Sequence, residues 1–108
     1  MVYVTQEQEG KNIVTATKYG EITFLAEKGD QMSFQTEDLV EKITMKLQGF
    51  NDMDYLLLIG DPAIIGVAVA IAAICNEGKV SLLKWDRQDK MYYAVNVNIN
   101  GGEINGNK

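Results

Sequence analysis

The run Tyr55-Leu56-Leu57-Leu58-Ile59-Gly60-Asp61-Pro62, residues 55–62, decides the fold of this 108-residue chain. Its first five residues are all apolar, whereas a strand buried on one face alternates apolar and polar side chains. We therefore expect residues 55–59 to form a central strand that is covered on both sides. Gly60 permits a tight turn, Asp61 is a good N-cap, and Pro62 suits the first position of a helix. The sequence thus predicts a strand followed at once by a helix.

The residues after this run extend it into a larger unit. The helix is expected over about 62–76, and Lys79–Trp85 is expected as the next strand. A strand, a helix and a strand in this order predict a βαβ unit at 55–85 with parallel strands. Residues 91–100 alternate apolar and polar side chains, which predicts an antiparallel hairpin over 79–99.

The N-terminal part reads as short strands and one helix. Thr36 is a candidate N-cap, and Glu37 and Asp38 suit the positive end of a helix over about 37–48. The fold class is therefore α/β, with a mixed, mostly β sheet and two helices. We expect a single domain over 1–100 and a flexible tail rich in Gly and Asn over 101–108. The N-terminal strands are expected at Val2–Gln6, Ile13–Thr17, Glu21–Ala26 and Gln31–Gln35.

Composition excludes several kinds of chemistry. The net charge of −5 disfavours binding to nucleic acid or to an anionic membrane surface. The absence of histidine removes Ser-His-Asp and Cys-His catalysis, and Cys75 alone forms no internal disulfide. The uninterrupted apolar stretch Ala63–Cys75 is shorter than the ~20 residues of a membrane span, and no export signal is evident. The sequence predicts no cofactor, no metal and a cytoplasmic protein.

The second helix has an unusual composition. From Ala63 to Cys75 it carries no charged or amide side chain, and a helix that is apolar all round must be covered all round. A bulky stripe suits the sheet, and a small-residue stripe lets another backbone approach closely. We expect a homodimer or a higher cyclic oligomer through this helix; the alternative is cover by the first helix and an N-terminal strand. The bulky stripe is Ile64, Val67, Ile71 and Ile74, and the small stripe is Gly66, Ala70 and Ala73.

Four residues form a candidate ligand site. Asp61 with Gly60, Asp86 and Thr36 each follow an expected strand, and ligands of parallel α/β sheets gather at the carboxyl ends of the strands. The start of the second helix could bind an anion, and two carboxylates could hold Mg²⁺ beside a phosphate. Capping and turn roles explain the same residues without a ligand.

The hairpin carries a candidate interface. Trp85, Arg87 and Tyr92 gather aromatic and positive side chains of the kind that dominate protein-binding surfaces. The same aromatic residues could instead be cross-strand pairs that set the register of the hairpin.

Several motifs carry a resemblance. The segments 54–62, 65–68, 83–87 and 92–93 resemble a group of short hypothetical proteins from tailed bacteriophages and environmental viral sequences. The resemblance implies a phage accessory protein made in the host cytoplasm, and it transfers no catalytic residue.

Two functional hypotheses remain open after this reading. The first is a non-enzymatic, homo-oligomeric interaction protein with a host or phage protein as a further partner. The second is a small phosphate- or nucleotide-binding protein, with Mg²⁺ dependence as an option.

Overall fold

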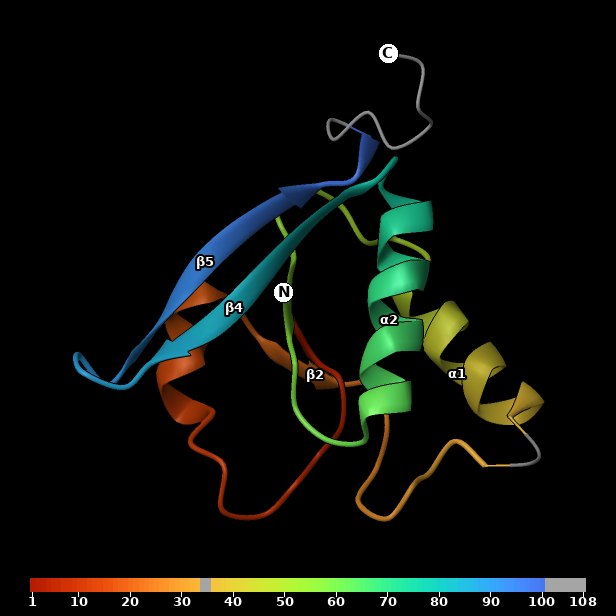
Figure 1. The fold of residues 1–108 in the computed structure, drawn as a ribbon, viewed down its shortest axis with the longest axis horizontal. Helices are drawn as coiled ribbons and strands as arrows, with labels where there is room; N and C mark the ends of the chain where they lie inside the picture. The colour runs from red at the N-terminus through yellow and green to blue at the C-terminus, as the bar shows by residue number, and fades with distance from the viewer. Residues whose placement is uncertain (34–35, 101–108) are drawn as a thin grey trace.

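A five-stranded sheet forms the centre of the computed structural model, which describes residues 1–33 and 36–100 (Figure 1). The strand order is β2-β1-β3-β4-β5, in which the first four strands are parallel and β5 is antiparallel to β4. The predicted α/β class is therefore confirmed. The strands are β1 (Val2–Val4), β2 (Ile22–Phe24), β3 (Tyr55–Leu57), β4 (Lys79–Asp86) and β5 (Met91–Asn98).

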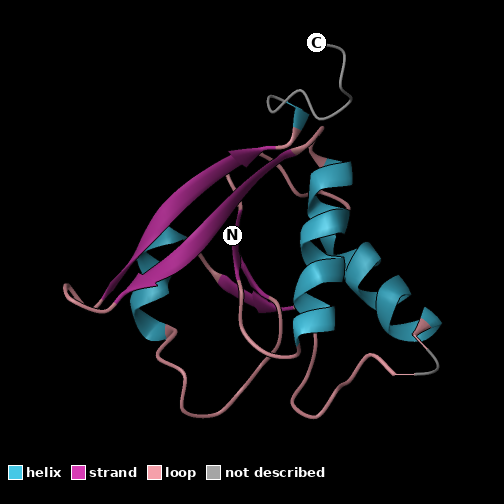
Figure 2. Cartoon of the chain, in the orientation of Figure 1, coloured by secondary structure: helices cyan, strands magenta, loops and turns pink. Residues whose placement is uncertain are grey.

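Helices lie on both sides of this sheet. The helices α1 (Glu37–Leu47) and α2 (Pro62–Cys75) cover one face, and the 3-10 helix η1 (Val14–Tyr19) covers the other (Figure 2). Leu56 of β3 is buried among residues of α1 and α2, whereas Leu57 is buried on the η1 side. The prediction of a central strand with cover on both faces is confirmed.

The βαβ unit and the hairpin also agree with the sequence. In the parallel pair of β3 and β4, Leu56 lies opposite Leu82 and Leu57 opposite Leu83. The antiparallel register of β4 and β5 runs from Lys79 opposite Asn98 to Asp86 opposite Met91. These pairs confirm the predicted parallel crossover and the hairpin.

The N-terminal third differs from the prediction. The strand expected at Ile13–Thr17 is wrong, because residues 14–19 form η1, in which Ala16 alone is buried. The Ala16 N–H donates to the Ile13 carbonyl oxygen at 3.0 Å, so the backbone bonds locally rather than to a neighbouring strand. Residues 31–33 are not a strand either, and the rest of that prediction, like the tail at 101–108, lies outside the described residues.

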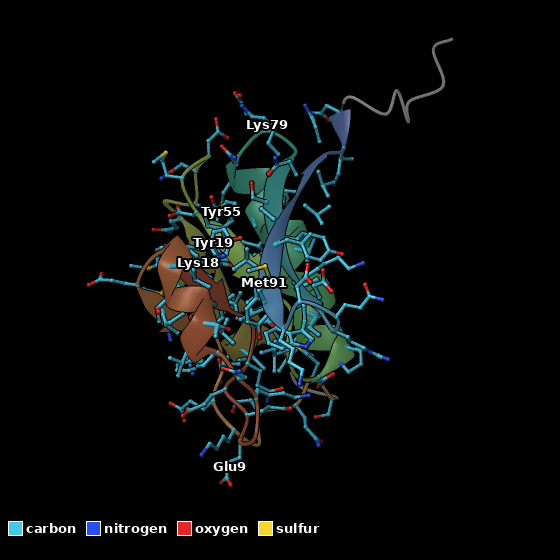
Figure 3. The ribbon with its side chains drawn as sticks, turned by 90° about the vertical axis from the view of Figure 1, so that its left-hand side faces the viewer. Glu9, Lys18, Tyr19, Tyr55, Lys79 and Met91 are labelled. Atoms are coloured by element: carbon cyan, nitrogen blue, oxygen red, sulfur yellow. The ribbon has the colours of Figure 1, made fainter. Side chains whose placement is uncertain are left out.

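Aromatic contacts fix η1 against the sheet. The Tyr19 ring meets the Tyr55 ring edge-on at a centroid distance of 5.1 Å, and Lys18 Nζ lies 5.2 Å from the Tyr19 centroid (Figure 3). The Tyr19 hydroxyl donates to the carbonyl oxygen of Tyr92 at 3.0 Å. η1 is thereby tied to both β3 and β5, which places the loop that precedes it beside the hairpin.

Candidate functional site

The strand-to-helix turn after β3 is held by hydrogen bonds to distant segments. Asp61 caps α2 as predicted, because its Oδ1 accepts from the Ala63 N–H at 2.9 Å. Its Oδ2 accepts from the Met32 N–H at 3.1 Å. Both carboxylate oxygens therefore serve the chain's own backbone, which accounts for this aspartate by its structural role.

Gln6 is the centre of this turn and was missed by the sequence analysis. Its side-chain Oε1 accepts from the Asp61 N–H at 2.8 Å, and its Nε2 donates to the carbonyl oxygens of Glu27 and Asp30 at 3.0 and 2.7 Å. Gly60 lies directly against it, with a φ of +110° and with 2.5 Å between a hypothetical Cβ and the Gln6 Cβ. Gly60 is thus required here by backbone conformation and by space.

Thr36 and Asp86 lie apart from this turn. Thr36 precedes α1, but its side chain makes no capping hydrogen bond, because its backbone is already helical at φ −109° and ψ −11°. Asp86 accepts from the N–H groups of Gln88 and Asp89 at 2.9 and 3.2 Å, so it closes the hairpin turn. In Figure 1 the β4–β5 turn and the start of α2 are separated, and none of the four predicted ligand residues lines either of two pockets that the described residues form.

α2 is covered by the sheet and α1 but has an uncovered flank. Ile64 is fully buried, and Ala73 packs into the cluster that contains the buried residues of α1. Ile74 is 81% exposed, so its predicted place against the sheet is wrong. Ile74 lies ten residues after Ile64 in the helix. At about 100° of rotation per residue, its side chain is directed roughly 80° away from that of Ile64 around the helix axis. Gly66 and Ala70, of the predicted small-residue stripe, are exposed on the same side.

The edge strand β5 adds a second exposed apolar row. Val97 lies opposite the buried Val80, which packs in the α1–α2 cluster, so this row is on the same side of the sheet as α2. The Ile99 N–H donates to the Gly78 carbonyl oxygen at 2.9 Å, which joins the end of β5 to the turn that follows α2. We call the combined area the α2–β5 surface; it comprises Gly66, Val67, Ala70 and Ile74 of α2 with Tyr93, Val95, Val97 and Ile99 on and after β5.

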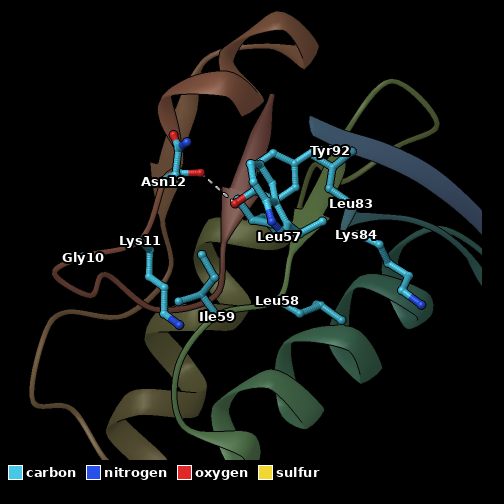
Figure 4. Close-up of a pocket in the computed structure, with 10 residues that line it drawn as sticks. Gly10, Lys11, Asn12, Leu57, Leu58, Ile59, Leu83, Lys84 and Tyr92 are labelled. Atoms are coloured by element: carbon cyan, nitrogen blue, oxygen red, sulfur yellow. Dashed lines mark hydrogen bonds between the residues drawn. The ribbon is translucent and has the colours of Figure 1, made fainter. Parts of the chain in front are cut away.

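A pocket of about 590 Å³ lies at the carboxyl ends of β3 and β4 (Figure 4). Its lining comes from three segments: the loop before η1, the end of β3, and the outer half of the hairpin. Apolar side chains dominate, and the polar members are Lys11, Asn12 and Lys84. The lining residues are Gly10, Lys11, Asn12, Leu57, Leu58, Ile59, Leu83, Lys84, Trp85 and Tyr92.

The two aromatic residues of the predicted interface, Trp85 and Tyr92, line this pocket. Trp85 and Tyr92 are directly opposite across the hairpin and meet edge-on at 4.9 Å, which confirms the reading as a cross-strand pair. Tyr92 is 6% exposed, and its hydroxyl donates to the Asn12 carbonyl oxygen at 2.8 Å. Burial raises the pKa of its phenol, which therefore keeps its proton and its bond to Asn12. Arg87 is exposed in the hairpin turn.

Metal and membrane features were also sought. Residues 1–33 and 36–100 contain no group of three or more acidic or cysteine side chains that could hold a metal ion. Within the same ranges, no helix has the length and apolar character that crossing a bilayer needs.

The comparisons with known proteins give one match. The family model described as Phage Pam3 gp32-like protein matches residues 1–99 of the chain. Neither the curated proteins nor the solved structures contain a match. The match extends over nearly the whole chain, including its N-terminal part, whereas the resemblance found in the sequence involved mainly the C-terminal half.

Proposed function

This chain belongs to the Phage Pam3 gp32-like family, whose description names no activity, and from this premise we propose that it is a non-enzymatic accessory protein that works as a homodimer. The α2–β5 surface is the dimer interface. The observation that carries the proposal is the exposed apolar flank of α2, on which Ile74 is 81% exposed. An apolar area of this kind on a folded domain marks a site of association.

The β5 edge supports a second copy of the same chain as the occupant. Residues 91–100 contain no charged side chain and no proline, although exposed edge strands are ordinarily protected by such residues. In a two-fold interface each side chain near the axis meets its own copy, so a charge there would repel itself. A neutral edge strand beside a neutral helix flank avoids that repulsion in a chain with a net charge of −5.

Paired variants test the interface. Ala70→Glu places a carboxylate on the α2 flank, and Met45→Glu, at a 66% exposed position of α1, makes a matched charge change outside the α2–β5 surface. Sedimentation velocity should show that Ala70→Glu weakens dimer formation by at least about 100-fold, because facing like charges cost several kcal/mol. Met45→Glu should leave the dissociation constant unchanged. Equal dissociation constants for the two variants would contradict the proposal.

The dimer also suggests how a partner would bind. Pairing of two copies through β5 would create a continuous surface that belongs to neither copy alone. A host or phage protein is the partner expected for such a surface. Pull-down with the wild type and with Ala70→Glu, under matched bait loading, would separate partners that need the dimer from partners that do not.

The alternative of a phosphate- or nucleotide-binding protein has weaker support. Asp61 uses both carboxylate oxygens on backbone N–H groups, and one of these belongs to Ala63 at the start of α2. Pro62 supplies no N–H donor at this helix end. A thermal-shift titration with ATP and Mg²⁺ tests the alternative, since a ligand at 100 times its Kd adds about 2.7 kcal/mol of stability.

A further inference from the structure

We propose that the pocket at the ends of β3 and β4 binds a small amphipathic anion, a carboxylate or phosphate monoester with an apolar body. Leu57 and Leu83 of its lining pack on the η1 side of the sheet, whereas Leu58 packs on the α2 side and Lys84 lies opposite Tyr93 of the α2–β5 surface, so the pocket is at the end of the sheet and borders that surface. Its volume of about 590 Å³ falls within the ~300–1,000 Å³ that ligand pockets occupy. Its place at the carboxyl ends of parallel strands is where ligands of open α/β sheets bind.

The apolar part of the ligand is indicated by the pocket walls. Leu57, Leu58 and Ile59 form one wall, and the Trp85–Tyr92 pair forms another. Trp85 remains 38% exposed although its ring packs edge-on against the buried Tyr92. Its indole ring therefore offers apolar area that the chain itself leaves uncovered.

The anionic part is indicated by two lysines. Lys11 comes from the loop before η1 and Lys84 from β4, and in Figure 4 Leu58 and Ile59 lie between them. The side-chain ammonium group of neither lysine forms a hydrogen bond or an ion pair with a described residue. By contrast, Lys28, Lys42 and Lys79 each pair with a carboxylate.

The charge of the lining differs from that of the whole chain. The lining contains two lysines and no aspartate or glutamate, although the chain has 15 acidic residues against 10 basic ones. Asn12 contributes its backbone carbonyl, which the Tyr92 hydroxyl uses (Figure 4). An apolar slot that is lined by two lysines and by no carboxylate favours an anion with an apolar body.

The chain contains its own probe for this binding. Trp85 is the single tryptophan of the sequence, so the intrinsic tryptophan emission comes from a residue that lines the pocket. We would titrate the full chain with sodium octanoate and with octyl phosphate, using 1-octanol as the neutral analogue and inorganic phosphate as the isolated head group. The proposal predicts a saturable change in emission with both amphiphiles, and at least about tenfold weaker binding of 1-octanol and of inorganic phosphate.

Variants assign the head group to the lysines. The double change Lys11→Gln and Lys84→Gln should weaken octanoate binding about tenfold and leave 1-octanol unaffected. Lys90→Gln, at an exposed position outside the pocket, is the matched control and should change neither. Ala70→Glu should bind octanoate as the wild type does, which separates this site from dimer formation.

Three results would overturn the proposal. Equal affinity for octanoate and 1-octanol would show an apolar slot without anion recognition. Binding of inorganic phosphate as tight as that of octyl phosphate would show that the site recognises the anion alone. An emission that stays constant with both amphiphiles would show that the pocket takes no ligand of this class.

Discussion

Replacement of Gly60 by alanine tests the strand-to-helix turn. The glycine has a φ of +110°, a conformation that costs an L-residue about 1–3 kcal/mol. The added methyl group would lie 2.5 Å from the Gln6 Cβ, and overpacking of this kind costs about 1–3 kcal/mol. We therefore expect Gly60→Ala to lower the free energy of unfolding by about 2–6 kcal/mol, a large part of the ~5–15 kcal/mol of a typical domain.

Gly49→Ala, outside the α2–β5 surface, is the matched control for this change. A Cβ at Gly49 would have nothing within 4 Å and its φ is not in the left-handed region, so alanine should stabilise the fold by about 0.4–1 kcal/mol through the unfolded chain. Both variants are compared by urea unfolding at one fixed protein concentration. A shift of the unfolding midpoint reports the change in stability as long as the slope of the free energy against urea concentration is unchanged. The two substitutions should move the midpoint in opposite directions. A Gly60→Ala midpoint within experimental error of the wild type would refute the account of this turn.

Three further predictions concern buried groups and ion pairs. Thr5→Val should cost about 1–3 kcal/mol in urea unfolding, because the fully buried Thr5 hydroxyl accepts from the Ile59 N–H at 2.8 Å; a midpoint equal to that of the wild type would argue against this role. Burial raises the pKa of Tyr92 above its ordinary value, so its contribution to stability is present below pH ~10 and is lost as pH rises through the raised pKa. In melting curves recorded from pH 8 to pH 11, the melting temperature should therefore fall less steeply with pH for Tyr92→Phe than for the wild type. Identical slopes would contradict this role of Tyr92. The hydrogen bond from Asn76, and then the charge of Lys79, hold the pKa of Asp52 below its usual range, so stability is lost as pH falls through that lowered pKa. Asp52→Asn should flatten the fall in melting temperature in a separate acid series from pH ~6 down to pH ~2, and an unchanged acid limb would count against the pair.

The parts of the fold that the sequence predicts well are those that neighbouring residues determine. The run at 55–62 has its strand, turn glycine, cap and proline within eight residues, and each has the role that its type favours. η1 was mistaken for a strand because residues 13–17 are a short run rich in β-branched side chains, and so short a run does not separate a strand from a short helix. Only the packing of Tyr19 on Tyr55 and Tyr92, far along the chain, decides between them.

The candidate site was harder to predict, because its contacts join distant segments. Gln6 meets Asp61 across 55 residues, and Tyr92 meets Asn12 across 80. No local pattern marks such pairs, so the pocket between the hairpin and the loop before η1 had no signal in the sequence. Ile74 was placed wrongly because a helix apolar on every side has no polar face to show which flank is exposed.

The solution mass of the wild-type chain tests the central claim, that the exposed α2–β5 surface joins two copies. The chain has a mass of 12.0 kDa, and the dimer has twice that, about 24 kDa. Sedimentation equilibrium from low to high micromolar protein should give a mass that rises with concentration to the dimer value and stays there. A mass of 12.0 kDa throughout the range would contradict the account.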